Sequence, residues 1–114
     1  MDDASTPTSI PFADFTKVDI RVGEITKAEK VEKSDKLMKL EVYLGELGTR
    51  TIVAGIAKHY ANPVGLRPLV VTNLEPRKMF GIESHGMVFA GVNPDNDVVT
   101  LATCDNVPAG TRIW

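Results

Sequence analysis

The 114-residue sequence is poor in the residues that supply covalent and metal chemistry. Cys104 is its only cysteine, so no disulfide can form within the chain and a zinc site built from several cysteines is excluded. The acidic neighbour Asp105 works against a thiolate at Cys104. His59 and His85 are the only histidines, and their spacing matches no known ligand pattern. We therefore expect no nucleophilic thiol, no metal and no other cofactor.

Long apolar runs are also missing, and no leader segment is expected. The longest apolar runs, such as residues 86–92, are far shorter than the roughly 20 residues that span a bilayer. Asp2 and Asp3 occupy positions where a secretory signal would carry cations. The common nucleotide-binding, metalloprotease and serine-hydrolase signatures are absent from the sequence. These absences favour a cytoplasmic protein that is not an enzyme.

The charge balance is slightly acidic, with a formal net charge of −2. Phosphate-binding domains are usually basic, so this average argues against nucleic acid as a partner. The distribution is uneven, however, because a lysine recurs at every third position from Lys27 to Lys39, whereas residues 92–106 carry only acidic charges. Exposed charges more than about 10 Å apart are largely screened in salt, so a basic patch can persist. Acidic residues alternate with these lysines, and a solvated strand edge without a ligand is the simpler alternative.

Alternating apolar residues predict an all-β chain. They alternate from Val18 to Val22, stop at Gly23 and resume at Ile25, which predicts a long strand bent at the glycine. Residues 54–60 lack alternation and precede an Asn-Pro pair, so we expect one short helix between the third and fourth strands. Further strands are predicted at 40–44, 49–53, 69–72 and 87–92, with a return strand at 98–101. This order predicts a five-stranded OB-fold barrel with an extra C-terminal strand.

The sequence also predicts how the domain begins and how it assembles. Residues 1–11 are rich in Ser, Thr, Pro and Asp without periodicity, which predicts a mobile N-terminal tail before a single domain over residues 12–114. An open barrel leaves strand edges and apolar surface that a second copy would cover, so we predict a symmetric homodimer. The apolar residues behind this prediction lie near both ends of the domain: Phe12, Phe15, Val18, Ile20, Val107, Ile113 and Trp114.

The most unusual stretch is residues 73–87. Its proline cannot donate to a sheet ladder, so we expect the fourth strand to end before a loop that carries the adjacent cations Arg77 and Lys78. Ser84 and Met87 add a hydroxyl and a soft apolar group at the far end of this loop. Cations for phosphates, polar groups for sugar or base edges, and apolar surface for stacking are the parts that RNA contacts require.

Spaced blocks at residues 15–23, 34–37, 53–56, 73–78, 81–84 and 86–87 resemble the tRNA-binding domain family. Members include the C-terminal domain of many methionyl-tRNA synthetases, a free-standing structure-specific tRNA-binding protein, the endothelial-monocyte-activating polypeptide domain and the export chaperone CsaA. The resemblance runs from about Phe12 to the end of the sequence. It implies an OB-fold homodimer that recognises folded tRNA without catalysis and assists an aminoacyl-tRNA synthetase, with the methionyl enzyme the first candidate.

The resemblance also implies which residues contact RNA. The matching positions, which are cationic, polar or soft apolar, are Lys36, Asn73, Arg77, Lys78, Ser84 and Met87. Phe80 is apolar where many members extend the basic run, which lowers the expected charge contribution, although an exposed ring there could stack on a base. From the residues alone, a Met87 that starts the fifth strand with its side chain in the core is the simpler interpretation.

A second hypothesis is a CsaA-like chaperone that binds peptides in an apolar groove of the dimer. The acidic net charge and the N-terminal tail favour it. CsaA-type members tend to lack the patterns found here at residues 34–37 and 84–87, so tRNA binding is the preferred hypothesis.

Overall fold

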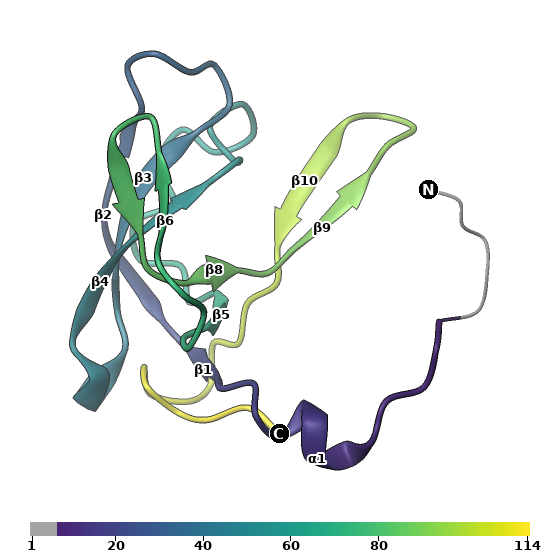
Figure 1. Ribbon diagram of the computed structural model, residues 1–114. Helices are drawn as coiled ribbons and strands as arrows, with labels where there is room; N and C mark the ends of the chain where they lie inside the picture. Colours follow the sequence, from purple (N-terminus) through teal and green to yellow (C-terminus); the bar gives the residue numbers. More distant parts are fainter. Residues whose placement is uncertain (1–6) are drawn as a thin grey trace.

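A computed structural model describes residues 7–114 (Figure 1), so residues 1–6 of the predicted tail lie outside the described residues. Strands dominate, which confirms the all-β class. In chain order the elements are α1 (Phe12–Phe15), β1 (Ile20–Val22), β2 (Glu24–Lys30), β3 (Met38–Tyr43), the 3-10 turn η1 (Gly45–Leu47), β4 (Thr49–Ala54), β5 (Leu69–Val71), β6 (Arg77–Met79), β7 (Ile82–Ser84), β8 (Met87–Val88), β9 (Ala90–Asn93) and β10 (Val98–Leu101).

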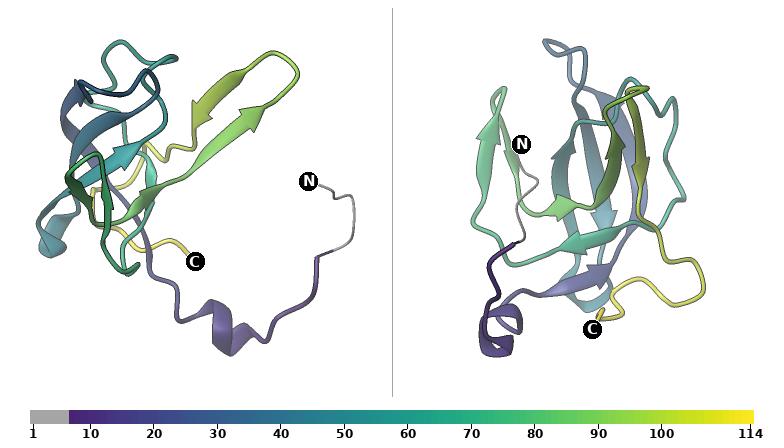
Figure 2. Two further views of the ribbon diagram at one scale, coloured as in Figure 1. Left: turned by 45° about the horizontal axis from the view of Figure 1, so that its top comes forward. Right: turned by 90° about the vertical axis from the view of Figure 1, so that its right-hand side faces the viewer.

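Two three-stranded antiparallel sheets form the barrel (Figure 2). One contains β2, β3 and β4, and the other contains β1, β5 and β8. Gly23 connects β1 to β2, and a Cβ at this position would lie 2.4 Å from Cγ1 of Val42. Only glycine therefore lets the strand bend this close to the core, and the predicted bend is confirmed. The residue after β7 is bonded to β4, because the His85 N–H donates to the carbonyl of Thr51 at 2.8 Å.

The interior of the barrel is filled by alternate residues of its strands. In β3, the buried Met38, Leu40 and Val42 alternate with Lys39 and Glu41, which are only partly buried. Burying each large aliphatic side chain contributes about 1.5–3 kcal/mol to folding. This inward set leaves the lysine and the glutamate on the outer face. The side chains that are fully excluded from solvent include Ile25, Leu40, Val42, Leu44, Ile52 and Val70.

Two hairpins extend from the barrel. The β9–β10 hairpin projects away from it, whereas the β6–β7 hairpin runs along the side of the barrel that carries β4 (Figures 1 and 2). We expected residues 73–87 to form a loop. Residues 77–79 and 82–84 form the paired strands β6 and β7 instead. Met79 pairs with Ile82, and the two residues between them have positive φ angles, 50° at Phe80 and 80° at Gly81. Two such residues define a type I′ turn, which matches the natural twist of a hairpin.

The predicted helix between the third and fourth strands is wrong. Residues 54–60 make a single turn instead, in which the Tyr60 N–H donates to the carbonyl of Ile56 at 3.1 Å. The N–H of Ala57 is bonded to the carbonyl of Lys36 at 2.9 Å, so a tertiary contact replaces the first helical bonds. The only α-helix in the described part of the chain is the four-residue α1 before the barrel. No helix within residues 7–114 is long and apolar enough to cross a membrane.

Candidate functional site

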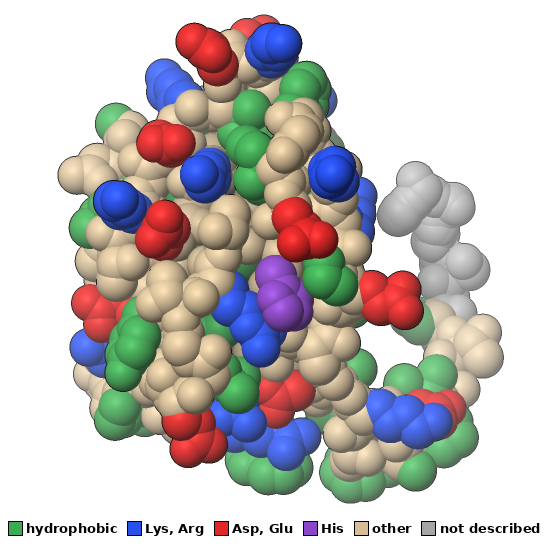
Figure 3. All heavy atoms as spheres, turned by 60° about the vertical axis from the view of Figure 1, so that its left-hand side comes forward, with side chains coloured by type: hydrophobic (Ala, Val, Ile, Leu, Met, Phe, Trp, Pro, Cys, Tyr) green, Lys and Arg blue, Asp and Glu red, His purple; other side chains and the backbone are tan. Residues whose placement is uncertain are grey.

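Three predicted contact residues are exposed cations. Arg77 and Lys78 lie on β6, and Lys36 lies in the loop between β2 and β3. Figure 3 brings forward the side of the molecule that carries β2, β4 and the β6–β7 hairpin, and on this face Lys and Arg side chains are interspersed with acidic ones. Charge alone therefore gives this surface a modest attraction for phosphate, and shape and uncharged contacts must contribute as well.

Met87 lies on the surface. It begins β8 opposite Val71 and is 47% exposed. The alternative in which its side chain fills the core is therefore wrong. The thioether is available for an apolar contact beside the end of β5.

Ser84, three residues earlier, is directed into the barrel and is 4% exposed. Its hydroxyl accepts a hydrogen bond from the Val53 N–H at 2.9 Å and donates to the carbonyl of Gly86 at 3.4 Å. Both interactions are internal, so the hydroxyl attaches the end of β7 to β4. In this structure Ser84 positions the segment that carries Met87.

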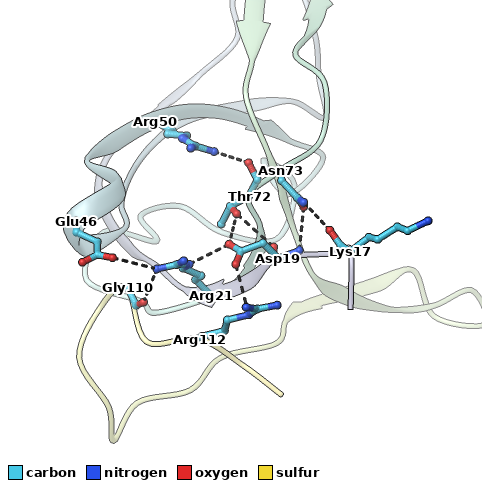
Figure 4. Close-up of polar contacts among 9 residues, drawn as sticks. All are labelled: Lys17, Asp19, Arg21, Glu46, Arg50, Thr72, Asn73, Gly110 and Arg112. Atoms are coloured by element: carbon cyan, nitrogen blue, oxygen red, sulfur yellow. Dashed lines mark hydrogen bonds and ion pairs between the residues drawn. The ribbon is translucent and has the colours of Figure 1, made fainter. Parts of the chain in front are cut away.

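Asn73 is exposed, yet its carboxamide is occupied by the backbone before β1 (Figure 4). The Asn73 Oδ1 accepts from the Asp19 N–H at 2.9 Å, and its Nδ2 donates to the carbonyl of Lys17 at 2.7 Å. The two bonds hold the end of β5 against the start of β1. Asn73 thereby shapes the exit of the segment that becomes the β6–β7 hairpin.

A partly buried charge cluster around Asp19 was not predicted from the sequence (Figure 4). The carboxylate accepts from the Arg21 Nε at 2.9 Å and from the hydroxyl of Thr72, and the Arg112 Nε lies 3.5 Å away. Burial raises the pKa of Asp19, but the Thr72 bond, the bond and charge of Arg21, and the charge of Arg112 outweigh it. The pKa is held below its ordinary value of 3.8. In the sequence, Asp19 and Arg21 are two residues apart and so lie on the same face of an extended chain, which was the available indication of an ion pair between them.

The same cluster anchors the C-terminal segment to β1. The Ile113 N–H donates to the carbonyl of Ile20 at 2.8 Å, and Arg112 forms an isolated bridge with Arg21. The Arg112 guanidinium also lies 4.3 Å from the centre of the Trp114 ring. The cluster therefore joins the start of β1, the end of β5 and the C-terminal segment at one place.

Among residues 7–114, no three His, Cys, Asp or Glu side chains form a group that could hold a metal ion. Cys104 is a free, partly buried thiol.

Comparison with known sequences places most of the chain in one family. The family model described as "Putative tRNA binding domain" matches residues 20–112. The chain is 45% identical over 106 residues to the methionine–tRNA ligase of Methanococcoides burtonii, covering 91% of this chain and 16% of that protein. The chain thus spans about a sixth of the length of the curated relatives that it matches.

Solved structures agree on the fold. A MetRS-related protein from Pyrococcus horikoshii aligns with a TM-score of 0.86 and 36% identity, covering 95% of this chain and 100% of that one. The chaperone CsaA of Bacillus anthracis aligns with a TM-score of 0.82 and 33% identity, covering 94% of this chain and 100% of that one. These alignments confirm the predicted OB-like barrel.

Proposed function

The chain belongs to the tRNA-binding domain family, and we propose that it binds folded tRNA without acting on it chemically. The observation that carries this proposal lies inside the matched region. Arg77 and Lys78 are exposed on β6 and Met87 is exposed at the start of β8, so cations and an apolar group occur on one continuous segment. Phosphates and the edges of sugars or bases are the groups that such a segment complements.

Each predicted contact residue has a distinct role in this proposal. Lys36, Arg77 and Lys78 are exposed and contact phosphates, and Met87 contacts a sugar or a base. Asn73 and Ser84 act as positioning residues, because their polar groups bond to the backbone at the start of β1 and to β4. These two anchors thereby hold the segment between β5 and β8 in its folded course.

The relatives support a proposal for the partner enzyme. The curated proteins that match are methionine–tRNA ligases, of which this chain corresponds to a small part. We propose that the chain supplies tRNA affinity to a methionyl-tRNA synthetase in the cytoplasm, either within a longer protein or as a separate subunit.

We also propose a homodimer. Phe12 is 73% exposed and Trp114 is 82% exposed, and none of the α1 residues is buried. The two phenylalanines of α1 lie with their ring centroids 6.3 Å apart and form an apolar pair away from the barrel. A second copy of this chain is the occupant that would cover this surface and bring two tRNA-binding segments into one particle.

Titration against folded and heat-unfolded tRNA at several salt concentrations tests the function. We expect a strong preference for folded tRNA. Replacing Lys36, Arg77 and Lys78 by alanine together should weaken binding and flatten the slope of log affinity against log salt by about 0.7–0.9 for each phosphate that is no longer neutralised. A matched variant with Lys36→Arg, Arg77→Lys and Lys78→Arg keeps every charge and should keep most of the slope.

Two outcomes would contradict this function. Equal affinity for folded and unfolded tRNA would remove the structural specificity, and an unchanged salt slope in the alanine variant would place the phosphate contacts elsewhere. Saturable binding of an unfolded peptide in place of tRNA would favour the chaperone hypothesis. An apolar groove of about 260 Å³, lined by residues of β4, β8, β9 and β10, is the feature that such a peptide would use.

A further inference from the structure

A second groove, of about 640 Å³, lies between the tip of the β6–β7 hairpin and the end of β2 with its following loop. The hairpin contributes Phe80 and Ile82, and the barrel contributes Lys30, Lys33 and Lys39. The proposed function uses none of these residues, although Phe80 was considered in the sequence, as an exposed ring that could stack on a base. The groove therefore places an aromatic ring opposite three cations from another part of the chain.

The Phe80 ring of this groove is attached to a residue with an unfavourable backbone conformation. Phe80 has a φ of 50°, a conformation that is uncommon for bulky residues and that Asn or Gly would adopt more easily at this turn position. The residue is nevertheless 59% exposed, so little burial of the ring offsets the backbone cost. Strain of this kind concentrates at functional sites, which directs attention to what the ring can bind.

The cations of the groove remain accessible. Lys30 and Lys33 are exposed, and the Lys39 Nζ lies 4.0 Å from Oε2 of Glu29, a loose ion pair at the surface. Such pairs are weak and are readily exchanged for a phosphate. Glu29 and Glu32 also line the groove, so its formal charge is only slightly positive. A long run of phosphates is disfavoured by this balance, whereas one nucleotide fits it.

We propose that this groove binds one unpaired nucleotide of the RNA, with its base stacked on Phe80 and its phosphate near Lys30 and Lys33. Stacking on an exposed aromatic ring accepts any base, and lysines supply the charge for the backbone. Unpaired nucleotides in loops and at ends are the parts of a folded RNA that can be splayed out in this way. This inference rests on the proposed function, because the groove adjoins the loop that carries Lys36 and the strand that carries Lys78.

Phe80→Leu tests the stacking contact, with binding measured to folded tRNA and to a fully paired RNA duplex of similar length. Loss of the ring should weaken tRNA binding by on the order of 5- to 100-fold and leave the salt slope unchanged. Binding to the duplex should not change, because it offers no unpaired base. Phe80→Trp keeps an aromatic face and should restore tRNA affinity. Tyr43→Leu removes another exposed ring from β3 and is the matched control, expected to bind like the unmodified protein.

The lysines give an independent measurement. Lys30→Gln with Lys33→Gln should flatten the salt slope for tRNA by about 0.7 for each phosphate of single-stranded RNA that these lysines neutralise. If the unmodified protein prefers folded tRNA and Phe80→Leu binds it equally well, the groove is not a nucleotide site, although the proposed function survives. If the unmodified protein shows no preference for folded tRNA, both proposals are wrong. An equal loss in Tyr43→Leu would also overturn the groove assignment.

Discussion

At the scale of single residues, Ser84 and Met87 show how neighbours on one connection acquire opposite environments. The Ser84 hydroxyl is the acceptor for a backbone N–H of β4, whereas Met87 opens β8 with its side chain on the surface. The chain between them passes through Gly86, whose φ is 128°. Side chains disfavour this conformation, and a Cβ here would lie 3.0 Å from the carbonyl oxygen of Val71, so glycine lets the chain pass close to β5 between the two residues.

Two alanine substitutions should therefore separate folding from binding. Ser84→Ala leaves the buried Val53 N–H without a partner and should lower the free energy of unfolding by about 1–3 kcal/mol, with little change in the tRNA affinity of the folded fraction. Met87→Ala should keep the melting temperature and lose about 1 kcal/mol of tRNA affinity, roughly a fivefold change, at an unchanged salt slope. Melting temperature and affinity are measured on the same samples.

Met87→Leu provides the control, because it keeps an apolar side chain of similar volume and should retain most of the affinity. A large drop in melting temperature for Met87→Ala would instead mean that this side chain supports the core. A loss of affinity in Ser84→Ala without any loss of stability would return its hydroxyl to the RNA contacts.

At the scale of elements, β1, the end of β5 and the C-terminal segment meet at Asp19. The folded-state pKa of this carboxyl lies below its ordinary value of 3.8. Ionised Asp19 thus stabilises the fold above about that pH, and the contribution is lost as the pH falls through the folded-state pKa. Acid should therefore first loosen the contacts among the start of β1, the end of β5 and the C-terminal segment.

Asp19→Asn tests this linkage by urea unfolding at pH values from about 7 down to 3. At neutral pH the variant should be less stable by about 1–3 kcal/mol, because hydrogen bonds to a charged group are removed. The difference between the two proteins should shrink as the pH falls below 3.8, where protonation removes the same charge from the unmodified protein. Asp14→Asn removes a surface acid paired with Lys17 and should cost little at any pH. A stability difference that stays constant with pH would exclude the ionic role.

At the scale of the whole molecule, the apolar pair on α1 and the exposed Trp114 make a homodimer testable. Sedimentation at micromolar concentration should give about twice the chain mass of 12.4 kDa. Phe12→Ser together with Phe15→Ser should shift the particle toward the monomer, because these variants cannot bury two aromatic rings between the copies. Val64→Ser changes an exposed apolar residue between β4 and β5 and should leave the dimer intact. A monomer for the unmodified protein at tens of micromolar would contradict the assembly.

The sequence by itself determined the strands of the barrel and the bend between β1 and β2, but not the β6–β7 hairpin. Alternation of apolar residues is a local property of a strand with one buried face, so β3 and β4 could be predicted from residues 40–44 and 49–53. The family resemblance likewise depended on residues close together along the chain. Residues 54–60 were predicted as a helix because propensity is local, but the bond from Ala57 to Lys36 comes from a distant loop.

Only the tertiary structure decided which polar groups are free to meet a ligand. The carboxamide of Asn73 and the hydroxyl of Ser84 look available in the sequence, yet backbone groups before β1 and in β4 occupy them. Asp19 meets Arg112 near the other end of the chain, and Phe80 faces Lys30 across a groove. Each of these pairings depends on strand register and on turns that join distant segments. Local periodicity carries no information about such distances, because it records which face a residue occupies and not what lies opposite.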